Sequence, residues 1–307
     1  MPNKPANPDD SINRRKFIHH TAGAAGAALL FSAPLVSHAA NFLDAEPITV
    51  GQIMDKFISQ IPNAPFPNTV DTLKAGNRDI QVTGVVTTMF ATIELIKKAI
   101  DLNANFIIAH EPTFYNHADN TQWLEHDEVY RYKTDLLRKH NIAIWRNHDY
   151  IHSLAADGVV KGAVDQLGWQ KFSTSSQYIY NLPPTTLANI IAHAKKSLNI
   201  QMVRYIGNTQ QVCKSAIYMP GSAGGQRQIE AISKYQPDVA LCGELSEWET
   251  AEYIRDARAT GKTTALVVLG HIASEEPGSA FMAQWLKQHI PEVKVTHIPT
   301  GNSLSFM

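Results

Sequence analysis

Two spacings of apolar residues alternate along the chain after residue 47. Short apolar runs rich in β-branched side chains, such as "ANFIIA" at 104–109 and "NIAIWR" at 141–146, are typical of buried strands. Segments in which apolar residues recur every three or four positions, such as "ATIELIKKAID" at 91–101, indicate amphipathic helices. The two patterns follow one another to the C-terminus, so we expect an α/β fold, a two-lobed subunit with mixed sheets.

The predicted elements fill both halves of the chain. In the first half, helices are expected at 48–61 (with Thr49 as N-cap), 91–101, 127–140 and 157–168, and strands at 79–89, 104–109 and 141–146. In the second half, helices are expected at 184–199, 224–235, 246–261 and 277–290, and strands at 176–182, 200–207, 212–219, 238–242, 263–269 and 293–298. The strands at 200–207 and 212–219 are expected to form a hairpin. We divide the chain into an N-terminal lobe at 40–170 and a C-terminal lobe at 171–307, with a soft boundary and lobes that can interleave.

The first 39 residues have the pattern of a twin-arginine export signal. Arg14-Arg15 precede a short apolar stretch at 21–36 that is rich in Ala and Gly, and Ser37-His38-Ala39 fits a small-residue cleavage site. A membrane anchor is the alternative, but the short stretch and the cleavage site favour removal. We therefore expect a periplasmic or secreted protein without a stable membrane anchor.

Composition narrows the classes of partner. The chain has 307 residues, 44% of them hydrophobic, and a formal net charge of −1, which becomes −3 when residues 1–39 are removed. The chain lacks the excess of positive charge that is typical of a nucleic-acid-binding protein, so we expect no nucleic-acid partner. The two cysteines, Cys213 and Cys242, lie in apolar runs. An oxidising compartment permits a disulfide, although two buried free thiols are the favoured interpretation.

Ionisable residues follow four of the predicted strands. They are His110 and Glu111 after 104–109, His148, Asp149 and His152 after 141–146, Glu244 after 238–242, and His271 and Glu275 after 263–269. Ligands of open α/β sheets bind outside the carboxyl ends of strands, so we expect these groups to form one shared site. His117 and Asp119 either extend its rim or belong to an ordinary polar loop.

The residue types in these clusters suit a divalent transition metal. Imidazole and carboxylate ligands without cysteine favour Zn, Fe or Mn, and we expect one or two ions per subunit. Because Pro277 indicates that the last long helix starts near it, His271 and Glu275 are expected in the preceding loop. Either Asp149 and His152 bind the ion while His148 orients a neighbour, or the roles are reversed.

Four blocks of the sequence together resemble a known family. "FIIAHEPTFY", "GSAGGQRQIEAI", "DVALCGELSEWETAEY" and "LVVLGHIASEE" are similar to signature blocks of the dinuclear-metal-centre hexamer family, also called GTP cyclohydrolase I type 2-like proteins. The resemblance covers residues 45–300. It implies a two-domain α/β subunit, a toroidal homohexamer, two adjacent metal ions between the lobes, and metal ligands at His110, His271 and Glu275.

The chain departs from this family pattern at two positions. The family usually has His-His-Pro where this chain has His110-Glu111-Pro112, and an Asp that bridges the metals where this chain has His152. An imidazole cannot bridge two ions as a carboxylate can. Either Asp149 or Glu111 takes the bridging role, or this branch binds one metal.

We expect a metal-dependent hydrolase whose small-molecule substrate the sequence does not specify. The candidates for a general base are Glu111, Glu244 and Asp149, with Glu244 either behind the metal ligands or facing the substrate. The alternative function is a metal-binding or scaffold hexamer without catalysis. The glycine block at 221–225 either cradles an anion at a helix start or forms a tight turn. Trp123, Trp145 and Trp248 are expected to pack rather than to stack on a ligand.

Overall fold

The computed structural model describes residues 47–305 and residue 307. The predicted export signal at residues 1–39 lies outside the described residues. Within the described part of the chain, no helix combines the length and the apolar character that crossing a membrane requires. Cys213 and Cys242 are both buried and free, which confirms the favoured interpretation of the two thiols.

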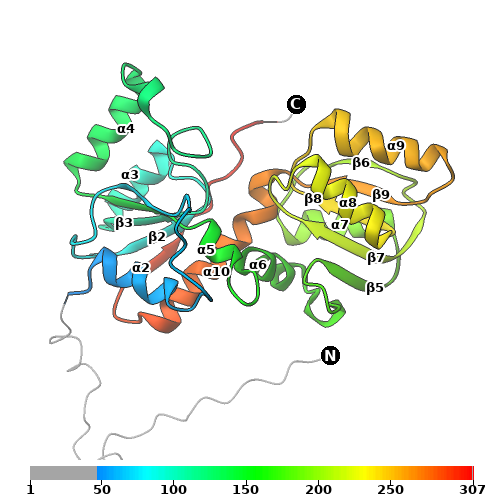
Figure 1. The fold of residues 1–307 in the computed structure, drawn as a ribbon, viewed down its shortest axis with the longest axis horizontal. Coiled ribbons are helices and arrows are strands. Elements are labelled where there is room, and N and C mark those ends of the chain that lie inside the picture. Colours follow the sequence, from blue (N-terminus) through cyan, green and yellow to red (C-terminus); the bar gives the residue numbers. More distant parts are fainter. Residues whose placement is uncertain (1–46, 306) are drawn as a thin grey trace, which may run out of the picture. The chain divides into compact units, whose positions relative to one another are not determined.

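Two five-stranded mixed sheets form the framework (Figure 1), which confirms the predicted α/β class. The first has the order β1-β4-β3-β2-β10 and contains β1 (Leu73–Ala75), β2 (Val85–Thr88), β3 (Phe106–Ala109), β4 (Ala143–Arg146) and β10 (Val295–His297). The second has the order β5-β7-β8-β9-β6 and contains β5 (Ile179–Thr186), β6 (Arg204–Ile206), β7 (Val212–Met219), β8 (Val239–Cys242) and β9 (Ala265–Val268). Because β10 pairs with β2, the C-terminal end of the chain completes the sheet of the N-terminal half.

Helices cover both faces of each sheet. On the first sheet, α2 (Val50–Ile58) and α10 (His271–His289) pack on one face, and α3 (Ile93–Asp101) and α4 (Glu128–Lys139) on the other. On the second sheet, α6 (Gly158–Leu167) and α7 (Leu187–Ser197) face α8 (Gly225–Tyr235) and α9 (Glu252–Ala259) across the strands. The short helix α5 (Asp149–His152), a π-helical turn (Glu247–Ala251) and two 3₁₀ turns (Gln122–Leu124, Gln170–Phe172) complete the described elements. With both faces covered, β2, β3, β4, β8 and β9 are buried along their whole length. They are mostly apolar, as expected for strands covered on both faces; the polar exceptions are Thr87 and Thr88 in β2 and Arg146 in β4.

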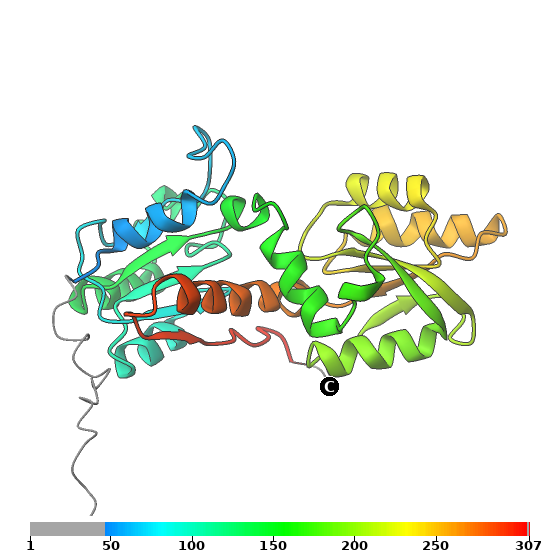
Figure 2. The same cartoon turned by 90° about the horizontal axis from the view of Figure 1, so that it is seen from below.

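Helices α6 and α10 lie against each other between the two sheets (Figures 1 and 2). Their backbones approach closely at two glycines. A Cβ at Gly162 would lie 2.3 Å from the Pro277 carbonyl oxygen, and a Cβ at Gly278 would lie 2.9 Å from Val159. This close packing holds α10 as one helix from His271 to His289 with Pro277 inside it. The prediction that this helix starts near Pro277 is therefore wrong, because tertiary packing outweighs the local cost of the proline.

The predicted hairpin between 200–207 and 212–219 is also wrong. The strand β6 pairs with β9, and β7 lies between β5 and β8. The buried β7 fills an interior position of the sheet, whereas the short and largely exposed β6 serves as its edge. The prolines Pro183 and Pro184 do not begin a helix. They lie in the edge strand β5, where the register shifts and no ladder hydrogen bond is required of them.

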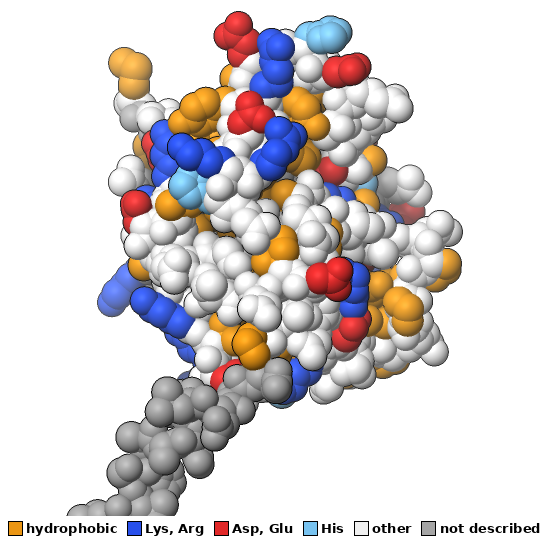
Figure 3. Space-filling model, turned by 90° about the vertical axis from the view of Figure 1, so that its left-hand side faces the viewer, with side chains coloured by type: hydrophobic (Ala, Val, Ile, Leu, Met, Phe, Trp, Pro, Cys, Tyr) orange, Lys and Arg blue, Asp and Glu red, His pale blue; other side chains and the backbone are white. Residues whose placement is uncertain are grey.

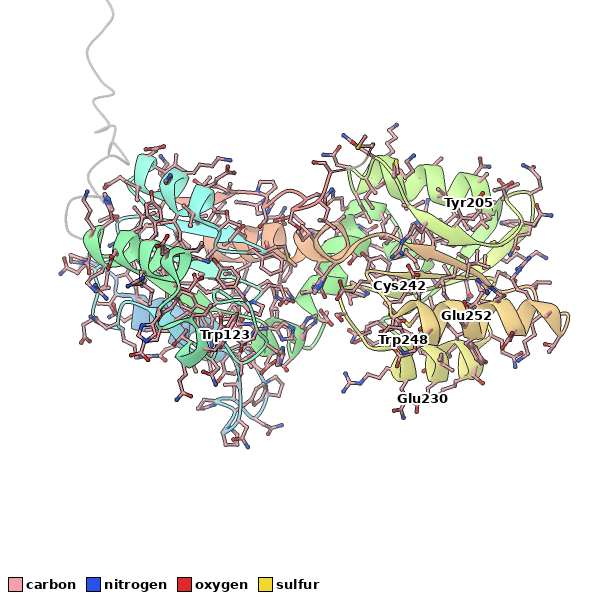
Figure 4. All side chains as sticks on the ribbon, turned by 90° about the horizontal axis from the view of Figure 1, so that it is seen from above. Trp123, Tyr205, Glu230, Cys242, Trp248 and Glu252 are labelled. Atoms are coloured by element: carbon pink, nitrogen blue, oxygen red, sulfur yellow. The ribbon has the colours of Figure 1, made fainter. Side chains whose placement is uncertain are left out.

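Surface side chains complete this picture. On the face shown in Figure 3, basic and acidic side chains are interspersed. Trp123 and Trp248 are 64% and 80% exposed and lie on the surface of the two halves (Figure 4), so the prediction that they are packing residues is wrong. It is confirmed for Trp145, which is fully buried in β4.

Candidate metal centre

The strand β3 delivers His110 and Glu111 to a buried position at its carboxyl end. The His110 side chain is 4% exposed, and its Nδ1 lies 3.2 Å from the backbone carbonyl oxygen of Asn147. A carbonyl oxygen only accepts hydrogen bonds, so His110 Nδ1 carries the proton and donates. In the neutral ring, Nε2 is therefore the unprotonated nitrogen. This atom is turned toward the other histidines and carboxylates.

Two residues separate the neighbouring strand β4 from the short helix α5, whose N-cap is His148 and whose last residue is His152. Asp71 fixes the start of this helix, because its carboxylate accepts hydrogen bonds from the backbone N–H groups of His148, Asp149 and Tyr150 at 2.8, 3.0 and 2.7 Å. Parallel pairing of β3 and β4 then brings the rings of His110 and His148 to 4.8 Å in a stacked arrangement.

Each of these two histidines has a carboxylate behind it. His148 Nδ1 lies 2.9 Å from Asp149 Oδ1, and His152 Nδ1 lies 2.9 Å from Asp157 Oδ2. Asp157 has a second task, since its Oδ1 caps the first turn of α6 by accepting from Val159 and Val160. A carboxylate at Nδ1 fixes the ring orientation and leaves Nε2 free, which is the arrangement that supports histidine ligands in metal sites.

The first turn of α10 brings His271 and Glu275 to the same place. His271 Nε2 lies 3.0 Å from Glu275 Oε2 and 3.1 Å from Glu111 Oε1. His110 Nε2 lies 3.5 Å from the same Glu275 oxygen, and His148 Nε2 lies 4.0 Å from Glu111 Oε1. The ends of β3, β4 and β9 therefore converge, and His110 and His271 contact one carboxylate.

Two groups within this cluster have the spacing of metal ligands. His110, His148 and His152 form one, and His110, Glu111 and Glu275 form the other; within each, one ligand atom per residue lies within 4.8 Å of the others. His110 belongs to both groups. Its Nε2 is buried and forms no hydrogen bond to a described residue, although the ion-pair partner Glu275 Oε2 lies 3.5 Å away. A buried imidazole nitrogen left without a hydrogen bond is costly in a protein interior, and a cation would satisfy it, so the residues present fit a divalent ion.

The charges of the cluster are strongly coupled. Burial lowers the pKa of His271, but the hydrogen bonds and charges of Glu111 and Glu275 outweigh burial and raise that pKa to about 10. Burial likewise opposes the ionisation of His110, and Glu275 and Glu111 together raise its pKa to about 8. In the other direction, His271 and His110 overcome the effect of burial on the carboxylates. They hold the pKa of Glu111 at about 2 and that of Glu275 well below its usual range. Without a metal, protonated imidazoles thus balance the two buried carboxylates.

His148 differs from the other two histidines. Burial, with a contribution from the charge of His110, lowers its pKa to about 4 even though Asp149 acts in the opposite direction. His148 is therefore neutral near pH 7 and ready to bind a metal without losing a proton.

A fully buried arginine supports Glu111 from behind. Arg146 Nη2 lies 3.5 Å from Glu111 Oε2, and its Nε donates to the backbone oxygen of His110 at 3.4 Å. Its Nη1 contacts the backbone oxygen of His117 and lies 3.6 Å from Asp119. Arg146 thus ties the 110–119 loop to the sheet and turns one Glu111 oxygen toward His271. Asp119 is held inside this loop, whereas His117 reaches the edge of the site.

Asp149 and Glu244 lie behind histidines instead of among them. Both oxygens of Asp149 are engaged, one by His148 and the other by the Thr69 hydroxyl at 2.8 Å and the Val70 N–H at 3.2 Å. Glu244 is about half exposed and lies 3.5 Å from His271 Nδ1. The geometry therefore gives these two carboxylates orienting positions, and among the three base candidates it brings only Glu111 to the middle of the cluster.

A cavity of about 940 Å³ opens onto the cluster. Glu111, His148, His152, His271 and Glu275 line it, together with residues of β7 and α8 from the second half of the chain. Its size is that of a site for a small molecule.

The glycine block at 221–225 forms a tight turn against this cluster. Gly221 has φ +61°, and a Cβ there would lie 2.1 Å from Glu275 Oε1. At Gly225, the first residue of α8, a Cβ would lie 2.3 Å from Glu249 Oε2, so a carboxylate already lies against this helix start. Of the two interpretations of the block, the structure favours the turn, because a second anion at the same helix start would be repelled.

Replacing Gly221 by Ala is expected to weaken metal binding and to lower the melting temperature. The substitution combines a left-handed backbone cost of about 1–2 kcal/mol with displacement of the Glu275 carboxylate. The matched control is Gly168→Ala at the end of α6, where φ is +68° and no atom lies within 4 Å of the added Cβ. Both variants should lose stability in thermal unfolding, but only Gly221→Ala should lose metal in elemental analysis. Equal metal content in the two would show that Gly221 does not position Glu275.

Comparison with known proteins places this geometry in a wider context. Residues 68–303 match the family model described as Duf34/NIF3 (NGG1p interacting factor 3). A "GTP cyclohydrolase 1 type 2 homolog" from Clostridium acetobutylicum is 25% identical over 227 residues, which cover 70% of this chain and 80% of that protein. A second protein of that name, from Staphylococcus epidermidis, is 30% identical over 186 residues; these cover 60% of this chain and only 47% of that protein.

Solved structures share the fold. The crystal structure of a Staphylococcus aureus hypothetical protein superposes with a TM-score of 0.70 at 19% identity, covering 85% of this chain and 99% of that one. A Bacillus cereus protein related to NIF3 gives a TM-score of 0.70 at 16% identity, covering 86% of this chain and 100% of that one. At such identities these likenesses establish the architecture alone.

Proposed function

This chain belongs to the Duf34/NIF3 family, and we propose that its buried histidine–carboxylate cluster binds one or two divalent metal ions that serve a hydrolytic reaction. The observation that carries the proposal is His110 Nε2. It is buried, oriented by the Asn147 carbonyl, without a hydrogen-bond partner among the described residues, and shared by both groups of candidate ligands.

The chain's own residues divide the work between binding and orientation. His110, His148, His152, His271, Glu111 and Glu275 supply the imidazole nitrogens and carboxylate oxygens that Zn, Fe or Mn prefer. Asp149, Asp157 and Glu244 hold the histidine rings from behind, and Arg146 holds Glu111. These supporting contacts fix which ring nitrogen faces the centre.

A divalent ion in such a centre supplies Lewis-acid chemistry and lowers the pKa of water. Glu111 is the carboxylate that we propose as proton acceptor, because it borders the cavity and faces the cluster. The wall formed by β7 and α8 limits access from the other side, so a substrate would bind in the cavity between that wall and the histidines.

The proposal is tested by metal analysis followed by activity assays. The purified protein, or the chelator-treated protein after incubation with Zn²⁺, Mn²⁺ or Fe²⁺, is expected to hold one or two ions per chain in elemental analysis. A panel of carboxylic esters, amides, phosphate esters and GTP should then reveal a hydrolysis that chelator abolishes and metal restores. GTP is included because of the names of the two bacterial relatives. Failure to bind any of the three ions would contradict the proposed centre, whereas binding without hydrolysis across the panel would favour the non-catalytic metal-binding alternative.

A further inference from the structure

A second cavity, of about 630 Å³, adjoins the cluster on the side of α3 and α4. Its walls are mostly apolar and include Phe90, Ala91, Ile93, Pro112, Tyr115 and Ile272. Glu111 and His117 line both this cavity and the larger one. The volume falls in the range of small-molecule sites, and the apolar walls suit a compact hydrocarbon body.

Lys133 on α4 lines this cavity and is buried. The residue is 3% exposed, and its Nζ donates to the backbone oxygen of Thr113 at 2.6 Å. The rings of Phe114 and Tyr115 lie 5.5 and 5.4 Å from Nζ. Among the described residues, no carboxylate oxygen lies within 4 Å of Nζ. Burial lowers the pKa of this lysine to about 8, and the charge of Asp119 acts in the opposite direction. A buried ammonium has three protons to donate and is normally paired with an anion, so Lys133 has donor capacity to spare.

Thr113 supplies a second unsatisfied group at the same wall. Its side chain is 1% exposed, and its hydroxyl Oγ1 has no hydrogen-bond partner among the described residues. Buried hydroxyls without partners are uncommon. Lys133 and Thr113 both line the cavity, and both can donate hydrogen bonds. Two donors that carry one positive charge between them match a singly charged acceptor such as a carboxylate better than a doubly charged phosphate.

We propose that this cavity binds a small apolar carboxylic acid, with a ring-sized aromatic or alicyclic body against the apolar walls and its carboxylate at Lys133 and Thr113. Lys133 and Thr113 are not among the proposed metal ligands, and occupation of this cavity does not require a metal. Because Glu111 lines both cavities, such an acid would lie beside the cluster as one part of a substrate or product; this link alone rests on the proposed metal function.

Calorimetric titration of the chelator-treated protein tests the site with four probes. Benzoate and cyclohexanecarboxylate are expected to bind saturably, and benzyl alcohol at least about tenfold more weakly, because it lacks the charge that a buried ammonium recognises. Acetate, which lacks the apolar body, should bind too weakly to detect. Absence of benzoate binding, or equal affinities for benzoate and benzyl alcohol, would overturn the proposal. Chelation keeps the probes from binding a metal, so this outcome is independent of whether the cluster is a metal centre.

Two substitutions locate the binding. Lys133→Met should reduce benzoate affinity at least about tenfold and bring the benzoate and benzyl alcohol affinities close together. Lys139→Met, an equal change of charge at an exposed position of the same helix, should leave both unchanged. Ile93→Trp should fill the cavity and remove binding of all probes while leaving Lys133 in place, which guards against misfolding of the lysine variant. Benzoate binding that survives both Lys133→Met and Ile93→Trp would place the acid elsewhere and refute the assignment.

Discussion

The affinity of the cluster for a divalent ion is expected to rise about hundredfold for each pH unit below pH 8, and about tenfold per unit from pH 8 to 10. The metal-free protein holds a proton on His271, whose pKa is raised to about 10, and on His110, whose pKa is raised to about 8. Both imidazoles must be neutral to bind an ion, so binding releases two protons below pH 8 and one proton between pH 8 and 10. His148 adds nothing to this slope, since its pKa is lowered to about 4.

Competition with a chromophoric chelator of known proton affinity measures this slope directly. Measurements at pH 6, 7, 8 and 9 should give a change of about two in the logarithm of affinity for each unit at the acidic end. His271→Asn should remove one of the two protons and reduce the slope to about one. A pH-independent affinity would show that neither histidine binds the ion.

The shifted pKa values of the cluster also determine the pH at which the metal-free protein is most stable. The raised pKa of His271 gives a contribution that is complete below pH 6.5 and is lost as the pH rises toward 10. The lowered pKa of Glu111 gives one that is complete above pH 4.5 and is lost as the pH falls toward 2. The lowered pKa of His148 costs stability below pH 6.5. In thermal unfolding of the metal-free protein, the summed contribution of these groups to stability should therefore be largest near pH 6.5. A saturating metal should move that maximum to higher pH.

Much of the centre follows from the pattern of strand ends alone. His110 and His148 each come directly after a buried apolar strand, and the parallel pairing of β3 with β4 makes them neighbours. Thr49 and Gly168 were recognisable as helix ends because capping depends on residues within one turn, and the structure has a capping box at Thr49 and a left-handed Gly168. Local chemistry of this kind is encoded within a few residues.

The parts of the site that the sequence did not reveal depend on long-range contacts. Asp157 begins the segment predicted to be helical, but nothing local indicates that its carboxylate both caps α6 and contacts His152. Arg146 resembles the polar end of a strand, and only the folded 110–119 loop makes it the buried partner of Glu111. Asp71 caps α5 from 77 residues away in the chain. Likewise, α10 continues past Pro277 because α6 packs on it. A local rule for proline does not take such a long-range contact into account.

Replacing Glu275 by Gln is expected to remove metal from the cluster almost entirely. The Oε2 atom of Glu275 lies 3.0 Å from His271 Nε2 and 3.5 Å from His110 Nε2, and the residue is 4% exposed, so the carboxylate is the negative charge that these histidines share. Gln keeps the size but has no charge, and its amide N–H₂ cannot accept from a protonated imidazole or bind a cation. The loss should exceed the roughly 10–100-fold expected for Asp149→Asn, which only weakens the hold on His148.

The adjacent residue of the same helix provides the control. Glu276 is a partly buried carboxylate that pairs with His297 at 2.8 Å and accepts from the Thr300 N–H at 3.0 Å, away from the cluster. Glu276→Gln removes one charge from α10 as Glu275→Gln does, but it should leave the bound metal per chain unchanged in elemental analysis. The expected order of metal affinity is therefore wild type and Glu276→Gln together, then Asp149→Asn, then Glu275→Gln. If Glu275→Gln binds metal as tightly as Glu276→Gln, the carboxylate serves only as the counter-ion of His271 and His110, and the ion, if any, is held by the three histidines His110, His148 and His152.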